Sequence, residues 1–168
     1  QAIVSTMSSV ANKNAALATR SQNYTIKIAN TIEEREAVFR LGYQVYLEKG
    51  YTTQNNREML IRDYDFESET TLLIVLDQQK KIVGSVAMLF DDSFKLPVEN
   101  IFSEEVAEIR SERTKIAELS RLVICPNNRN AKEILLLLFN YLAIYIFQVK
   151  SYDHMVVQVN PRHKEYYK

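Results

Sequence analysis

The chain has 168 residues, of which 21 are basic and 21 acidic, so its formal net charge at pH 7 is zero. This balance excludes a strongly basic nucleic-acid-binding chain, and any electrostatic attraction of a partner has to come from a local patch. Hydrophobic residues make up 46% of the chain, a value typical of a globular domain with a substantial core. The single cysteine permits no internal disulfide, which fits a cytoplasmic protein.

The first part of the chain is rich in Ser, Ala and Asn. We expect residues 1–23 to form an N-terminal arm or an additional helix, ahead of a single domain over residues 24–168. Alternating apolar residues predict a strand at 24–29. Thr31 and Glu34 then form a T-x-x-E capping box, which predicts a helix that ends near Gly50.

The remaining elements follow from apolar runs and turn signals. A charged segment after Pro97 has helical tendency, and a polar turn precedes a helix at about 131–149. The apolar run within that helix, residues 134–147, is 14 residues long and too short to span a bilayer. We therefore expect a helix buried on most of its faces and no membrane span. Strands are predicted at 70–76, 82–90, 115–125 and 154–160, and a last helix begins within 160–168.

This order of elements predicts an α/β (α+β) fold with a mixed sheet and helices on both faces. The short turn between the strands at 70–76 and 82–90 makes that pair antiparallel. The strand, helix and strand over residues 115–160 should instead form a parallel, right-handed crossover unit.

Polar residues interrupt the predicted core strand IAELSRLVI, residues 116–124. Glu118 and Arg121 are costly to bury unless they are paired or used. One interpretation is a structural ion pair between them. The other is that both face a ligand cavity, with Glu118 accepting a proton and Arg121 ordering an acidic group, and a β-bulge would turn both to one side.

Other candidate motifs carry weaker signals. The turn and helix start PNNRNAKEI, residues 126–134, offer backbone N–H groups together with Arg129 and Lys132 to an anion, but the turn lacks glycine. Cys125 is best explained as packing. Two histidines and one cysteine without ligand spacing predict no metal site.

Three stretches resemble one known family. They are VFRLGYQVYLEKGY (38–51), VGSVAML…LPVENIF (83–102) followed by IAELSRLVI (116–124), and VNPRHKEYY (159–167). Together they resemble the GNAT-type N-acyltransferase fold over about residues 24–168. The match is closest to the long-chain N-acyl amino acid synthases and more distant to the acyl-homoserine-lactone synthases. The resemblance implies a mostly antiparallel GNAT-like sheet, and implies that the C-terminal strands of the family fold are missing from this chain.

The resemblance also implies a reaction, in which an acyl chain moves from acyl carrier protein to the amino group of an amino acid. Glu118 would remove the ammonium proton, Arg121 would order the acceptor carboxylate or the acidic loop around Asp65, and Tyr167 would be the general acid. No tightly bound cofactor is implied, since the co-substrate is an acyl-carrier-protein thioester or acyl-CoA. The remaining residues implied are Ser120, Leu122 and Val123 for substrate, and Arg129, Asn130 and Lys132 for the donor or carrier.

Departures from the family pattern keep alternatives open. The lactone synthases have arginine at the positions of Gly42 and Ala87, which disfavours their reaction here. The glycines of a CoA-binding turn would fall on Lys132 and Ile134, which disfavours a pyrophosphate cradle. A CoA-dependent GNAT enzyme, a lactone-synthase-like enzyme and a non-catalytic acyl-binding or regulatory member remain as alternatives. Carrier docking would use a local basic patch, with Arg110, Arg113, Lys115, Arg129 and Lys132 as candidates.

Overall fold

The computed structural model describes residues 3–8, 23–92, 94–111, 113–126 and 128–159. They belong to two compact units. The first contains the described parts of 1–16, 88–120 and 142–168, and the second contains those of 17–87 and 121–141. The predicted helix start within 160–168, with Tyr167, lies outside the described residues.

The second unit contains the first predicted helix and hairpin. Thr31 caps helix α1 (Ile32–Glu48), since its side chain accepts a hydrogen bond from the Glu34 N–H at 3.2 Å. Gly50, at φ +70°, follows the helix end in a conformation that glycine adopts without strain. The elements of this unit are β2 (Thr25–Ile28), α1 (Ile32–Glu48), the 3₁₀ turn η2 (Asp63–Phe66), β3 (Thr71–Leu76) and most of β4 (Ile82–Phe90).

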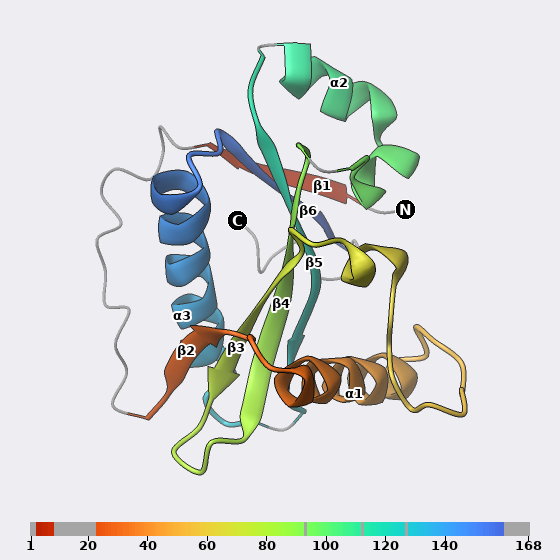
Figure 1. Ribbon diagram of the computed structural model, residues 1–168, viewed down its shortest axis with the longest axis vertical. Coiled ribbons are helices and arrows are strands. Elements are labelled where there is room, and N and C mark those ends of the chain that lie inside the picture. The colour runs from red at the N-terminus through yellow and green to blue at the C-terminus, as the bar shows by residue number, and fades with distance from the viewer. Residues whose placement is uncertain (1–2, 9–22, 93, 112, 127, 160–168) are drawn as a thin grey trace. The chain divides into compact units, whose positions relative to one another are not determined.

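The first unit contains the charged helical segment and the last strand. The segment after Leu96 divides into a 3₁₀ turn, η3 (Pro97–Asn100), and a helix, α2 (Ser103–Ser111). Residues 3–8, which the sequence analysis assigned to an arm or a helix, form strand β1 (Ile3–Ser8) instead. It pairs antiparallel with β6 (His154–Val159), beside which it lies in Figure 1.

Strand β5 (Ile116–Ile124) has residues in both units, as β4 does. The strands are hydrogen-bonded in the order β1-β6-β5-β4-β3-β2. β5 pairs in parallel with β6, with Ile116 opposite His154, which confirms the predicted parallel unit. β2 pairs antiparallel with β3, so the sheet is mixed as predicted.

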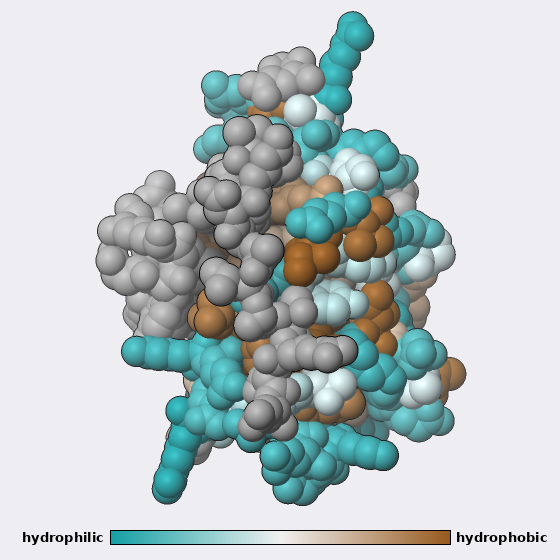
Figure 2. All heavy atoms as spheres, turned by 90° about the vertical axis from the view of Figure 1, so that its left-hand side faces the viewer, coloured by the Kyte–Doolittle hydropathy of each residue, from teal (hydrophilic) through white to brown (hydrophobic). Residues whose placement is uncertain are grey.

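The helix between β5 and β6 consists of α3 (Ala131–Ala143) and a π-helical turn, η4 (Ile144–Val149). It was expected to be buried on most of its faces, and this is wrong, because Leu136 and Val149 are 62% and 64% exposed. Figure 2 shows hydrophobic residues (brown) at the surface among hydrophilic ones (teal) on the side of the molecule that carries α3. The buried residues of this helix repeat at helical spacing: Ile134, Leu137, Leu138, Leu142 and Ile146.

The same stretch is the one helical segment among the described residues that is long and apolar enough to cross a membrane. Ala131–Val149 meets these criteria by length and composition only, with 28% of its most apolar window buried. The core helix of a soluble protein also meets them.

Candidate active site

Between two hydrogen bonds that join the ends of β4 and β5, the β5 segment contains one more residue than the β4 segment. The Asp91 N–H donates to the Ile116 carbonyl, and the Cys125 N–H donates to the Val83 carbonyl. Val83 and Asp91 are eight positions apart in the chain, whereas Ile116 and Cys125 are nine apart. The extra residue lies in the interval that contains Arg121, whose φ is +48°. One unmatched residue in an antiparallel pair is the mark of a β-bulge, which re-aims the side chains around it.

Glu118 lies in the first unit and is 2% exposed. Its Oε2 accepts a hydrogen bond from the Val98 N–H of η3 at 2.9 Å. Burial raises the pKa of Glu118 from 4.5 to about 7. The hydrogen bond from Val98 partly offsets this rise, and the negative charge of Glu99 adds a smaller rise. A carboxyl group of this kind exchanges a proton close to neutral pH.

Arg121 lies in the second unit, where it is tied to η2. Its Nη1 and Nη2 each donate to one carboxylate oxygen of Asp65 at 2.7 Å, and Nη1 also donates to the Leu60 carbonyl at 2.9 Å. Both side chains of the pair are 1% exposed. The ion pair that Arg121 makes is therefore with Asp65, so the interpretation as a pair with Glu118 is wrong.

Aromatic rings surround the Arg121 guanidinium. Its carbon lies 5.1 Å from the centre of the Phe39 ring and 5.7 Å from that of Tyr64, within the range of cation–π attraction. Burial acts to lower the pKa of Arg121, but the hydrogen bonds and charge of Asp65 outweigh it, and the pKa is raised. Arg121 Nε is buried without a hydrogen-bond partner among the described residues. The arginine thus remains charged and fixed.

The other candidate residues of β5 fall on either side of the bulge. Ser120 is half-buried and belongs to the first unit, while Leu122 is half-buried and belongs to the second. Val123 is 2% exposed and packs against Leu41 and Val45 of α1. Val123 therefore contributes to the core of the second unit.

The turn between β5 and α3 uses its own polar groups. The Asn130 N–H donates to the Asn128 side chain at 2.9 Å, and the Asn130 side chain donates to the Tyr24 hydroxyl at 2.9 Å. The Ala131 N–H donates to the Asn128 carbonyl. Arg129 and Lys132 are exposed. The Asn130 and Ala131 N–H groups at this helix start are thus engaged within the chain and not free for a phosphate.

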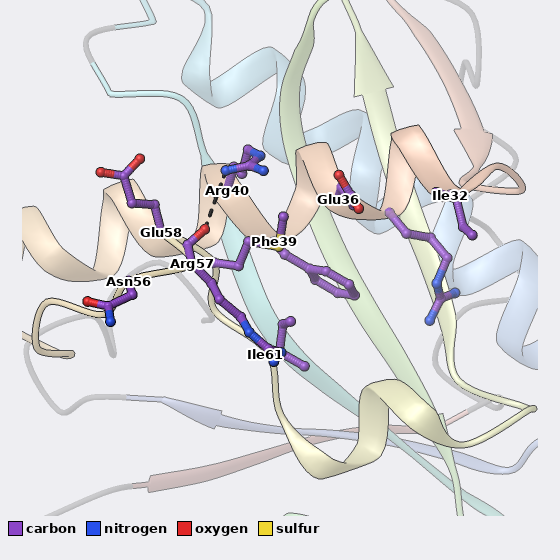
Figure 3. A pocket seen from close by; sticks show the side chains of 10 residues that line it. Ile32, Glu36, Phe39, Arg40, Asn56, Arg57, Glu58 and Ile61 are labelled. Carbon is purple, nitrogen blue, oxygen red and sulfur yellow. Dashed lines mark hydrogen bonds between the residues drawn. The ribbon is translucent and has the colours of Figure 1, made fainter.

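An open pocket of about 680 Å³ lies beside the Arg121 cluster in the second unit. In Figure 3 the Phe39 ring projects from α1 into the space between the helix and segment 56–61. Arg40 bridges the two walls by donating to the Arg57 carbonyl at 3.4 Å, drawn as a dashed line. Arg35 donates to the Asp65 carbonyl at 3.0 Å, so the pocket and the Arg121 cluster share a contact. The α1 residues that line the pocket are Ile32, Arg35, Glu36, Phe39 and Arg40.

Sequence reasoning missed the partners of Glu118 and the residues of this pocket. Val98 contributes a backbone N–H, which no side-chain pattern reveals. The Leu96-Pro97-x-Glu99 stretch does carry a signal, because Glu99 accepts the Leu96 N–H across the start of η3 as a capping acid does. Arg110, expected in a basic docking patch, instead pairs with Glu99 at 3.0 Å.

The strand order, the parallel β5–β6 pair and the irregular β5 define the mixed α/β fold of the GNAT acyltransferases. One similar structure is a GCN5-related N-acetyltransferase from Kribbella flavida, with a TM-score of 0.51 and 10% identity. The match covers 93% of this chain and 47% of the acetyltransferase. Another is the acyl-homoserine-lactone synthase LasI, with a TM-score of 0.55 and 17% identity. The match covers 74% of this chain and 66% of LasI.

A more similar structure is FeeM, an N-acyl amino acid synthase from uncultured soil microbes. It has a TM-score of 0.72 and 20% identity, and the match covers 86% of this chain and 75% of FeeM. The family model for the N-acyl amino acid synthase FeeM matches residues 37–168. The chain therefore belongs to the FeeM family of N-acyl amino acid synthases, and it is an acyltransferase. A comparison with curated protein sequences finds no match.

Proposed function

We propose that this synthase takes its acyl chain from the thioester of acyl carrier protein, in the cytoplasm, and transfers it to the amino group of a free amino acid. Two features of the β5–α3 turn support the carrier as donor. Lys132 and Ile134 replace the glycines of a CoA-binding turn, and the Asn130 and Ala131 N–H groups are bonded within the chain. A carrier presents only a phosphopantetheine arm, so it requires no such cradle. Arg129, Asn130 and Lys132 stay proposed as its contacts.

The observation that carries the proposal is the buried carboxyl of Glu118, whose pKa burial raises to about 7. Attack by an amine on a thioester requires that the ammonium lose a proton first. Glu118 would take that proton, directly or through water. The free amine would then attack the thioester carbonyl to form a C–N bond, the C–S bond would break to release the pantetheine thiolate, and the nitrogen would lose its surplus proton to solvent to give the amide. Tyr167 stays proposed as the group that protonates the thiolate.

The acceptor requires a cation for its carboxylate. Arg121 is committed to Asp65, which favours its role in ordering the acidic loop over direct contact with the acceptor. Arg121 stays proposed as the residue that orders this loop, and Ser120 and Leu122 stay proposed as substrate contacts.

The test is product formation from defined donors. The protein is incubated with long-chain acyl carrier protein and a pool of amino acids, and N-acyl products are identified by mass spectrometry. Glu118→Gln and an acyl-CoA donor run in parallel. Loss of a general base lowers the rate by roughly 10²–10⁴-fold. Product from the carrier, absent with CoA and lost in the variant, supports the proposal. Equal rates from both donors would remove the carrier preference, and a fully active Glu118→Gln would remove the base.

A further inference from the structure

The hydrogen bond that reaches Glu118 comes from a short, specifically held turn. Pro97 has no N–H group, and the Leu96 N–H donates to Glu99 Oε1 at 2.9 Å. The Val98 N–H is therefore the first donor of η3 that remains for a group outside the turn, and it donates to Glu118. Leu96 and Val98 are fully buried, so the turn is anchored on its apolar side.

Arg110, near the end of α2, fixes the other side of this turn. Its Nη1 donates to Glu99 Oε2 at 3.0 Å and its Nη2 to Glu99 Oε1 at 3.1 Å, a two-point contact with the same carboxylate that caps the turn. Nη2 also lies 3.5 Å from Asp91 Oδ2 at the end of β4. Such paired contacts between a guanidinium and a carboxylate define orientation as well as distance.

We propose that Arg110 and Glu99 are positioning residues for Glu118. They hold η3 so that the Val98 N–H stays on one oxygen of the Glu118 carboxylate and the other oxygen is left for the proton of the acceptor ammonium. This inference rests on the proposed role of Glu118 as the base. Among the described residues, the Glu118 side chain has no hydrogen bond besides the one from Val98.

The charges around Glu118 give this arrangement a measurable consequence. Within the described residues, Glu99 is the charged group that acts on Glu118, and its negative charge raises the Glu118 pKa. Arg110 opposes that charge, and its hydrogen bonds lower the pKa of Glu99. Asp91 is the second acid that Arg110 contacts, and Val156 of β6, opposite Glu118 in the register, is apolar.

Loss of Arg110 should therefore raise the pKa of Glu118 for two reasons. The negative charge of Glu99 would act on Glu118 without the positive charge of Arg110 to offset it. The Val98 N–H would also be held less firmly on the Glu118 carboxylate. A hydrogen bond to a charged group corresponds to a shift of about one pH unit. We measure kcat against pH with acyl carrier protein and saturating acceptor. In Arg110→Gln we expect the acid limb of this pH profile to move to higher pH by that amount. Relative to wild type, the rate should fall about tenfold at pH 6 and recover at pH 9.

Glu99→Gln should move the same limb in the opposite direction. The glutamine oxygen still accepts the Leu96 N–H, but the negative charge next to Glu118 is gone, so the acid limb shifts to lower pH. Lys49→Gln is the control, because it removes one positive charge from an exposed residue outside the candidate site. That variant should keep the wild-type profile. A merely structural role would lower the rate at every pH and would give no shift of opposite sign.

A readout without turnover separates this inference from the proposed function. Wild type and each variant are labelled with ¹³C at the glutamate carboxyl, and the resonance missing in Glu118→Gln is titrated. Opposite shifts of that titration in Arg110→Gln and Glu99→Gln support the positioning role even if the enzyme uses another base. An unmoved titration in both overturns it, even if Glu118→Gln is inactive and the base is thereby supported. If Arg110→Gln does not fold, Arg110→Met, which also removes the charge, takes its place beside Glu99→Gln.

Discussion

Glu118 is a buried titratable residue whose surroundings disfavour its charged form. Its carboxyl is buried with one N–H donor, and burial raises its pKa from 4.5 to about 7. The folded chain therefore holds this proton more tightly than the unfolded chain does. The stability that comes from the protonated form is fully present below pH 4.5 and is lost as the pH rises through 7.

The size of this loss can be tested with Glu118→Gln, which mimics the protonated carboxyl at every pH. The pKa difference corresponds to at most about 3 kcal/mol of unfolding free energy. We expect the variant to match wild type near pH 4.5 and to become more stable than wild type by up to that amount at pH 8. Chemical denaturation of both proteins at several pH values measures this difference. Exposed Glu105→Gln is the control, and an equal response of the two variants would contradict the assignment.

At the level of elements, periodicity was sufficient for most of the fold. The Thr31 cap of α1, the hairpin of β3 and β4 and the parallel unit of β5 and β6 are all local patterns, and the structure confirms them. Strand β1 was not predicted, because its polar residues gain their structure from pairing with β6, more than 140 positions along the chain. The same limit applies to contacts such as that of Arg121 with Asp65, which are 56 residues apart.

The Arg121–Asp65 pair connects β5 to η2 and gives a test at this level. Removal of one partner from a buried ion pair leaves an uncompensated charge and costs about 3–5 kcal/mol. We expect Asp65→Ala to lower the unfolding free energy by that amount. Asp63→Ala, two residues away and exposed, should change it by less than about 0.5 kcal/mol. The measurement is urea denaturation of both variants, and a similar small effect in each would show that the pair does not stabilise the loop.

For the whole molecule, the zero net charge means that electrostatic attraction of the proposed acyl carrier protein would have to come from local cations. The five basic residues that the sequence suggested for carrier docking differ in their ion pairs and in the unit to which they belong. Arg110 pairs with Glu99 and Asp91, and Lys115 lies 3.5 Å from Asp92. Arg113 belongs to the first unit, whereas Arg129 and Lys132 belong to the second, next to the turn that starts α3. Arg129 and Lys132 are therefore the pair to test.

Docking by these two cations predicts a salt dependence that is specific to the carrier. The apparent KM for acyl carrier protein should rise several-fold between 50 mM and about 300 mM salt, because exposed charges are screened over this range, while kcat stays constant. The KM for a short acyl-pantetheine donor, which lacks the carrier surface, should not change. The double variant Arg129→Glu with Lys132→Glu should raise the carrier KM at low salt and remove its salt dependence. Lys49→Glu, an exposed lysine after α1, is the matched control and should keep the wild-type response. If the salt response of the double variant equals that of the control, the carrier docks elsewhere on the protein.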